Sequence, residues 1–413
     1  MLCVSSRSSL NSLLVGRLNG KIRRLFYSRD NKNNMPTRFD SIRPFDDSDL
    51  SVVLPKLFNN KEFIDSIVAF KFSAWPRFMR PALGFFTRHY IIKQITKVKT
   101  HRDFQRLVEP YMERMISTTT ESFTVSGLDK LDLSQACLFM SNHRDIALDP
   151  AFVNWALHIN GLDTVRIAVG DNLLKKEWVA DLIRLNKCFI VKRSATDRRE
   201  KLSAAKLLSE YIEVSLNAEQ QHIWIAQREG RAKDGNDITN PAILSMLALN
   251  KSKDVKFSQY ILSLRIVPVS ISYEFDPCDI NKAKELQEVE REGSYDKPDN
   301  EDVKSIVKGI TGQKGRVHIH FGEVLASEFN TAKEVAEHID QEILQGYKSF
   351  PTGPVAAKML SIDGITIDKN TQESDHYTQA AADYLQARVV DLTKEEQKKL
   401  LSMYACAYIR KMS

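Results

Sequence analysis

The residues best suited to chemistry form a short polar segment after an apolar run. The run spans 136–140 and leads into Asn142 and His143, with Asp149 and Pro150 further along. A histidine that is fixed at a strand end and oriented by an acid has what a general base needs. Because proline favours the first helical position, we expect a helix to begin at Pro150, with Asp149 at its N-cap.

A second polar segment, at 227–235, follows the apolar run 222–226 and reads Gln-Arg-Glu-Gly-Arg-Ala-Lys-Asp-Gly. Charged loops at the ends of two strand-like segments indicate one shared site. This segment supplies Glu229, Gly230, Arg231 and Lys233 as candidate site residues.

Three other uses of the histidine lack the residues that they require. A protein-kinase His-Arg-Asp loop needs an Asn five residues after its Asp, where this chain has Pro150, and it needs a Gly-rich phosphate loop that we do not find. The Gly-x-Ser-x-Gly elbow of serine hydrolases is also absent. His143 has no closely spaced His or Cys companions for zinc, so we expect no metal.

Four motifs, in order, resemble those of the glycerolipid acyltransferase family, whose members move fatty acyl groups from a thioester to a glycerol phosphate hydroxyl. The resemblance covers about 130–325, and a Phe-Gly-Glu at 321–323 is similar to a late family motif. The matching segments are Asn142-His143 with Asp149 for Asn-His-x4-Asp, 189–193 for Phe-Ile-x-Arg, Glu229-Gly230-Arg231 for Glu-Gly-(Thr or Gly)-Arg, and 267–269 for Val-Pro-Val.

The chain departs from the family pattern at two places. Five residues separate His143 from Asp149, where the family has four, and no residue stands between Gly230 and Arg231. The first departure leaves Asp145 as an alternative partner for the imidazole. We favour Asp149 because it keeps the position just before the expected helix.

The resemblance implies a catalytic group of Asn142, His143 and Asp149. His143 would act as general base on the acceptor hydroxyl, while Asp149 would hold the reactive tautomer. The hydroxyl would attack the thioester directly, so no cysteine and no cofactor are expected. Backbone N–H groups of the loop between strand and helix are expected to stabilise the developing oxyanion.

The resemblance also implies a phosphate-binding group. Arg193 and Arg231, with Lys233, are expected to bind the acceptor phosphate, because guanidinium groups suit phosphate oxygens. Glu229, next to Gly230, is expected to orient an arginine.

The predicted activity is O-acyl transfer in phospholipid synthesis, with acyl-CoA or acyl carrier protein as donor. The best guess for the acceptor is 1-acyl-glycerol 3-phosphate. Glycerol 3-phosphate is close behind, because 229–235 also resembles the Gly-Gly-Arg-Ser-Arg-Thr-Gly stretch of that subgroup. The alternative is a catalytically silent peripheral lipid-binding protein of the same fold, which the altered motif spacings would suit.

Charge and aromatic residues point to a membrane surface. No Asp or Glu occurs from 66 to 102, where eight Lys and Arg alternate with seven aromatic residues. This pattern suits an anionic membrane surface, and without a recognised motif we expect no nucleic-acid partner. A helical hairpin packed on the main domain is the alternative.

We find no apolar run long enough to span a bilayer. Widely spaced cysteines fit a reducing compartment, so we expect a peripheral membrane protein on the cytoplasmic face.

The N-terminal residues differ in composition from the rest of the chain. Positions 1–29 hold no acid, several serines and many Arg or Lys, which is the composition of an organelle transit peptide. Met35 is an alternative start, in which case the first 34 residues are a disordered or spurious leader. Organellar import is expected only if 1–34 is a genuine transit peptide.

Alternating strand-like and helix-like segments predict an α/β fold, with a largely parallel sheet flanked by helices. Strands are expected at 136–140, 164–169, 188–192, 222–226, 265–273 and 316–321, and helices at 150–160, 173–184, 198–216, 332–350, 375–390 and 393–412. The chain divides into a leader (1–39), a helical membrane-interface region (40–130), the α/β acyltransferase domain (131–329) and a C-terminal helical region (330–413). A charged insert at 280–308 is expected to form a helix–loop–helix.

Overall fold

The structure is a computed structural model, and it describes residues 38–72, 75–298, 300–362 and 375–413. The expected leader therefore lies outside the described residues, apart from positions 38 and 39. The choice between Met1 and Met35 as the start also lies outside them.

A single seven-stranded sheet organises the chain, with strand order β1-β7-β6-β2-β5-β3-β4. Only the β6–β7 pair is antiparallel, and all other neighbours run parallel. This arrangement confirms the predicted α/β class. The strands are β1 (Ser122–Ser126), β2 (Leu138–Ser141), β3 (Arg166–Gly170), β4 (Cys188–Val191), β5 (Ile223–Ala226), β6 (Ile266–Tyr273) and β7 (Arg316–Phe321).

The six predicted strands are confirmed to within two residues, whereas β1 was not predicted. It lies in the range 40–130, for which we expected mostly helices. It is an edge strand, and its side chains are exposed or only partly buried, so it lacks the apolar run that reveals the central strands.

Helices cover both faces of the sheet, and alternate strand residues point to each. Leu138 and Met140 of β2 belong to the apolar cluster on one face of the sheet, whereas Phe139 between them belongs to the cluster on the other face. This period of two is the one that a pleated strand imposes. Because both faces are covered, all eight residues of β6 are buried.

The helices on or beside the sheet are α5 (His101–Thr119), α6 (Leu148–Ile159), α7 (Glu177–Leu185), α8 (Arg198–Asn217), α9 (Pro241–Leu247), α10 (Phe257–Ser263) and α13 (Ala332–Gly346), with short 3₁₀ turns η2 (Leu128–Lys130), η3 (Asp171–Leu173) and η4 (Ala248–Asn250). Helices α6, α7, α8 and α13 were predicted, whereas α9 and α10, which lie between β5 and β6, were not. The expected helix at 173–184 starts later, at Glu177, because Lys176 has extended backbone angles. The charged insert forms the predicted pair, α11 (Asp279–Glu292) and α12 (Glu301–Thr311).

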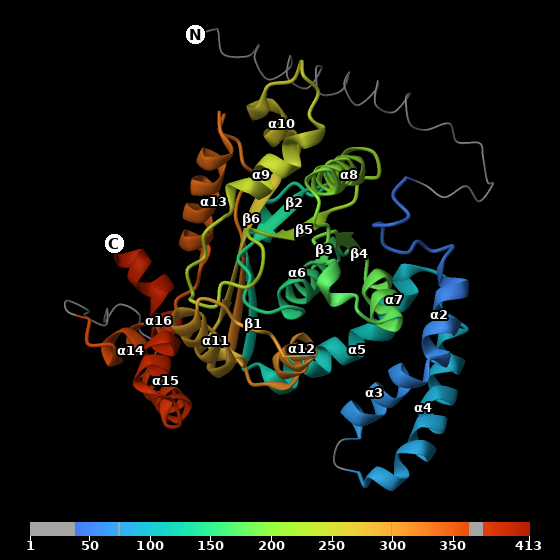
Figure 1. The fold of residues 1–413 in the computed structure, drawn as a ribbon, viewed down its shortest axis with the longest axis horizontal. Coiled ribbons are helices and arrows are strands. Elements are labelled where there is room, and N and C mark those ends of the chain that lie inside the picture. Colours follow the sequence, from blue (N-terminus) through green and yellow to red (C-terminus); the bar gives the residue numbers. More distant parts are fainter. Residues whose placement is uncertain (1–37, 73–74, 299, 363–374) are drawn as a thin grey trace.

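Two helical groups extend from the sheet on opposite sides (Figure 1). The N-terminal group holds α2 (Leu50–Asn59), α3 (Lys61–Lys71), η1 (Arg77–Met79) and α4 (Arg80–Ile95), which share an apolar cluster with α5 and α7. The C-terminal group holds α14 (Thr352–Met359), α15 (Asp375–Val389) and α16 (Lys394–Met412), which pack on α11. Of these, α14 was not predicted. The helix expected at 332–350 ends earlier, at Gly346, because Tyr347 has extended backbone angles.

Candidate active site

The predicted site residues lie at one edge of the sheet, in the loops after three strands and, for Asp149, in the first turn of α6. Strands β2, β5, β3 and β4 are neighbours and parallel, so the loops that follow them leave the sheet on the same side. His143 follows β2, Glu229 and Arg231 follow β5, and Arg193 follows β4. The carboxyl ends of parallel strands are where ligands bind in open α/β sheets.

His143 is paired with Asp149. The imidazole Nδ1 lies 2.8 Å from Asp149 Oδ2, and the histidine side chain keeps 14% of its surface exposed, whereas Asp149 is fully buried. Because a carboxylate only accepts hydrogen bonds, Nδ1 is the protonated nitrogen of the neutral ring. Nε2 has no partner among the described residues, so its lone pair is available.

Asp149 is held by four donors. Its Oδ2 also accepts the backbone N–H of Arg144 (2.6 Å) and of Asp145 (3.0 Å), and its Oδ1 accepts the Tyr273 hydroxyl (2.8 Å). Such a set of donors stabilises the ionised form of a buried carboxyl group. The carboxylate therefore has one fixed orientation toward His143.

The prediction that Asp149 is the N-cap of a helix beginning at Pro150 is wrong. The helix α6 begins at Leu148, two residues before Pro150, and its N-cap residue is Ala147. Asp145 takes the capping role, because its Oδ1 accepts the N–H groups of Ala147 (2.9 Å) and Leu148 (2.8 Å). Burial and the nearby Asp149 charge raise the pKa of the Asp145 carboxyl.

These contacts also change the expected oxyanion donors. The backbone N–H groups of Arg144, Asp145, Ala147 and Leu148 all donate to the two aspartates. They are not free to stabilise an oxyanion, so the expectation is wrong for these four groups.

Asn142 fixes the start of the loop to the sheet. Its Nδ2 donates to the Ile271 carbonyl (2.9 Å), and its Oδ1 accepts the Ile271 N–H (2.8 Å). The side chain thus continues the pairing of β2 with β6, and it is fully buried. Asn142 therefore positions the histidine that follows it and does not face the open side of the site.

The loop after β5 is hydrogen-bonded to the loop at 142–147, which holds His143 and is called the histidine loop below. The N–H of Ala232 donates to the His143 carbonyl (2.9 Å), which brings Arg231 next to the histidine. Arg231 is half-buried, and within the described residues its guanidinium makes no hydrogen bond or ion pair. Gly230 is exposed with φ of +73°, a conformation that glycine adopts without strain.

The other predicted cations have partners. Arg193 Nη1 lies 3.4 Å from Glu229 Oε1, and both side chains are exposed. The Arg193 N–H donates to Asp171 Oδ1 (3.1 Å), which fixes the loop after β4 to the end of β3. Lys233 pairs with Glu285 of α11. Among Arg193, Arg231 and Lys233, Arg231 is thus the cation without an acidic partner in the described chain.

A buried ion pair links the histidine loop to the loop after β5. Arg144 Nη2 lies 2.6 Å from Asp237 Oδ2, and both side chains are less than one-tenth exposed. Burial raises the pKa of the Asp237 carboxyl, while the Arg144 charge opposes that shift. Lys282 of α11 adds a hydrogen bond to the Arg144 carbonyl (2.7 Å).

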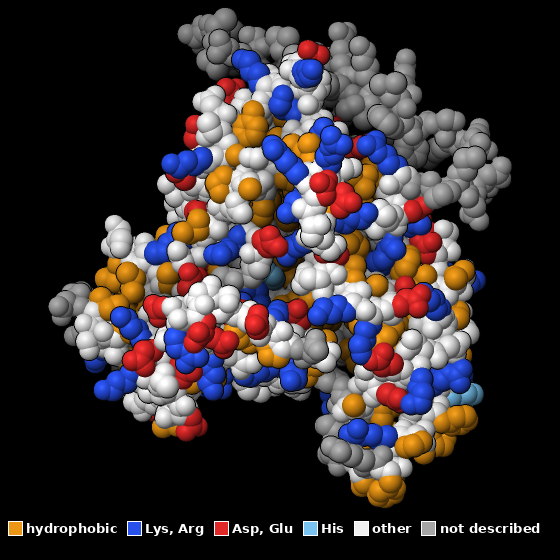
Figure 2. All heavy atoms as spheres, in the orientation of Figure 1, with side chains coloured by type: hydrophobic (Ala, Val, Ile, Leu, Met, Phe, Trp, Pro, Cys, Tyr) orange, Lys and Arg blue, Asp and Glu red, His pale blue; other side chains and the backbone are white. Residues whose placement is uncertain are grey.

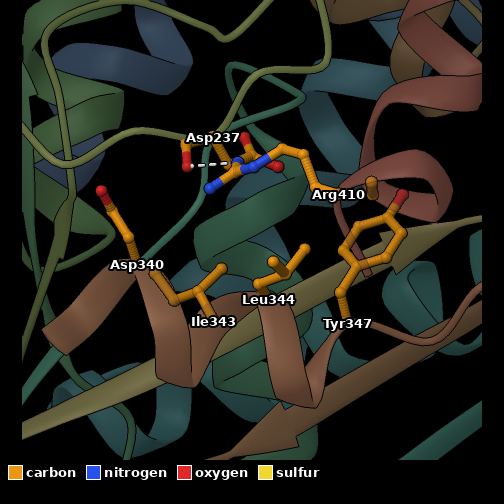
Figure 3. A pocket seen from close by; sticks show the side chains of 7 residues that line it. Asp237, Asp340, Ile343, Leu344, Tyr347 and Arg410 are labelled. Carbon is orange, nitrogen blue, oxygen red and sulfur yellow. Dashed lines mark hydrogen bonds between the residues drawn. The ribbon is translucent and has the colours of Figure 1, made fainter. Parts of the chain in front are cut away.

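The C-terminal helix contacts the same pair. Figure 3 shows Arg410 of α16 pointing at Asp237, whose carbonyl accepts from Arg410 Nη1 (3.0 Å). A cavity of about 10 Å³, lined also by Asp340 and Tyr347, lies beside this contact. It has room for about one water molecule. Helix α16 therefore packs against the segment that fixes the histidine loop.

Comparison with protein families gives a match to the acyltransferase family model over residues 122–272. The matched range contains β1 to β6, except the last residue of β6, and every predicted site residue. The chain carries an acyltransferase domain. This match confirms the family resemblance and the prediction of an acyltransferase.

Neither curated sequences nor solved structures add evidence on the activity of that domain. No curated protein sequence matches the chain. The solved structure of the 1-acyl-sn-glycerophosphate acyltransferase PlsC from Thermotoga maritima is similar, with 14% identity, a TM-score of 0.33, and 72% of this chain and 97% of that chain covered. Among the described helices of the acyltransferase, none is long and apolar enough to cross a membrane.

Several residues that shape the site were not predicted. Tyr273 ends β6, and Asp171 follows β3, so the position at a strand end could have indicated both. Asp237, Lys282 and Trp224, whose ring lies 5.8 Å from the His143 ring, carry no such signal. They reach the site only through tertiary packing.

We predict that Asp237→Ala lowers the free energy of unfolding by about 3–5 kcal/mol, because Arg144 would stay buried without its partner. Urea denaturation measures this loss. The double variant Arg144→Met with Asp237→Leu removes both charges and is expected to recover much of it. A single variant as stable as the native protein would contradict the role of the pair.

Proposed function

We propose that this acyltransferase moves a fatty acyl group from a thioester donor to a hydroxyl of a glycerol phosphate or lysophospholipid. The best acceptor candidate is 1-acyl-glycerol 3-phosphate, and the donor is acyl-CoA or acyl carrier protein. The observation that carries the proposal is the His143 imidazole, which Asp149 holds at Nδ1 and which has no partner at Nε2 within the part of the chain that the structure describes. Arg231, one loop away, supplies a cation for an acceptor phosphate.

The reaction is a direct transfer. His143 Nε2 removes the proton from the acceptor hydroxyl while its oxygen attacks the thioester carbonyl carbon. The imidazolium is stabilised by Asp149. The tetrahedral intermediate collapses, the carbon–sulfur bond breaks, and the thiolate takes the proton back from His143. The thioester supplies the activated acyl group, so the proposal needs no cofactor.

The phosphate of the acceptor is proposed to bind between Arg231 and Arg193. A guanidinium without an acidic partner gains a full charge-assisted contact when phosphate arrives. Arg193 has an exposed contact with Glu229 at 3.4 Å, and exchanging this contact for one with phosphate costs little. Lys233 is already neutralised by Glu285, so we assign it a structural part in the loop.

The acyltransferase is proposed to work at a membrane surface, on the cytoplasmic face. Large apolar side chains are exposed at the end of the α3–α4 hairpin: Trp75, Phe78, Phe85, Phe86 and Tyr90. Figure 2 shows hydrophobic side chains gathered at this end of the molecule. Exposed Lys71, Arg88, Lys93 and Lys97 flank them, and residues 66–102 contain no Asp or Glu. Apolar and basic groups together suit an anionic bilayer surface.

The test of the function is an acyl-transfer assay with purified protein and vesicles. Labelled acyl-CoA or acyl carrier protein is offered with glycerol 3-phosphate and several lysophospholipids. We expect an acylated product with a phosphate-bearing acceptor, and a rate at least about 100-fold lower for His143→Ala. Product formation by folded His143→Ala at the native rate would contradict the general base. No product with any pair, from folded and lipid-bound protein, would favour the silent lipid-binding protein.

We predict that Arg231→Ala raises KM for the acceptor by about 10-fold or more, because a hydrogen bond to a charged group is lost. KM for the donor should change little. Lys233→Ala is the matched control in the same loop, and its effect on acceptor KM should be much smaller. Equal rises in donor and acceptor KM for Arg231→Ala would contradict a phosphate contact.

We predict that Phe85→Ser with Phe86→Ser weakens binding to anionic vesicles by about 10-fold or more, because two apolar side chains no longer enter the bilayer. Vesicle co-sedimentation measures the affinity. Val390→Ser, which changes another exposed apolar side chain far along the chain, should leave it unchanged. Equal binding by the double variant and the native protein would refute this surface.

A further inference from the structure

Tyr273 lies between two elements that the active site requires. It is the last residue of β6, where it pairs with Val317 of β7. Its hydroxyl reaches across to α6 and donates to Asp149 Oδ1 at 2.8 Å. The ring rests against Phe152 of the same helix, with centroids 5.8 Å apart. The hydrogen bond therefore joins the end of a central strand to the acid that holds the histidine.

The hydroxyl is the donor of this hydrogen bond. Burial and the Asp149 charge raise the pKa of Tyr273 well above its usual range, so the phenol stays protonated. The other carboxylate oxygen is already occupied by His143 and two backbone N–H groups. Tyr273 is thus the one side chain that contacts Asp149 Oδ1 among the described residues.

We propose that Tyr273 is a positioning residue for acyl transfer, which fixes the Asp149 carboxylate and limits how strongly it stabilises the protonated His143. The proposal rests on the proposed function for its kinetic part. A carboxylate that is anchored at both oxygens cannot rotate, so Nε2 keeps one direction toward the acceptor. A donor at Oδ1 also withdraws charge from the carboxylate, which weakens its hold on an imidazolium.

Removal of the hydroxyl has a defined consequence. In Tyr273→Phe the ring still fills its buried site, but Asp149 Oδ1 loses its donor. The carboxylate then interacts more strongly with a protonated histidine, and the unprotonated base forms only at higher pH. The neighbouring charged groups are the same in both proteins: Arg144, Asp145, Asp237, Asp276 and Lys282.

The experiment compares kcat, KM and the pH dependence of kcat/KM in native protein and Tyr273→Phe. We expect kcat to fall about 10-fold, as for the loss of one hydrogen bond to a charged group, with little change in KM. The acid limb of the profile should move to higher pH. In the Asp149→Asn background, Tyr273→Phe should cause no further loss, because it acts through the carboxylate. An unshifted acid limb, or additive losses, would overturn the proposal.

Tyr384→Phe is the matched control. The Tyr384 hydroxyl also donates to a buried carboxylate, Asp279, at 3.0 Å, but it lies in the C-terminal helical group. Its removal should cost stability and leave kcat and the acid limb unchanged. If it shifts the acid limb as Tyr273→Phe does, the effect is not specific to Asp149 and the proposal fails.

A second readout separates this proposal from the proposed function. Histidine labelled with ¹⁵N reports the titration of His143 by NMR without any substrate, and His143→Gln identifies its signal. A titration that moves to higher pH in Tyr273→Phe supports the proposal even if no acyl transfer is found. A titration that does not move overturns it, even if the protein is an active acyltransferase.

Discussion

The arrangement of this acyltransferase depends on one buried carboxylate. Asp149 accepts four hydrogen bonds, from the imidazole of His143, two backbone N–H groups and the Tyr273 hydroxyl. A buried carboxylate without such donors would be costly, so the loop, the helix and the strand that supply them are fixed relative to one another. The hydrogen bonds that stabilise the buried charge therefore also hold the His143 imidazole in one orientation.

The helical additions support this arrangement from behind the loop. Lys282 of α11 donates to the Arg144 carbonyl, and Arg410 of α16 donates to the carbonyl of Asp237. At Gly309 of α12, an added Cβ would lie 2.2 Å from Asp145 Oδ2, so only glycine lets this helix approach the capping aspartate. Helices α11 and α12 of the insert thus contact the histidine loop, and α16 contacts the loop after β5, whereas the α3–α4 hairpin presents its aromatic residues to the surroundings.

The sequence predicts the sheet well because buried central strands need continuous apolar runs, and each polar motif directly follows such a run. Prediction from the sequence fails where tertiary contacts decide which side chains become partners. Asp145 and Asp149 are both acids near a helix start, and only the folded loop shows that Asp145 caps the helix while Asp149 meets the histidine. Asp237 lies 93 residues from Arg144 in the chain, and Lys233 is neutralised by a helix of the insert. The edge strand β1 is too exposed to leave an apolar pattern.

The most direct test of the account is a comparison of kcat/KM for Asp149→Asn and Asp145→Asn in the same acyl-transfer assay. Both changes replace a carboxyl group near the start of α6 by an amide of nearly the same size. We expect kcat/KM to fall about 100-fold or more for Asp149→Asn, because the amide favours the wrong tautomer of His143. The loss for Asp145→Asn should be much smaller, since an amide oxygen can still cap the helix. A larger loss at Asp145 would contradict the pairing of His143 with Asp149 as the basis of catalysis.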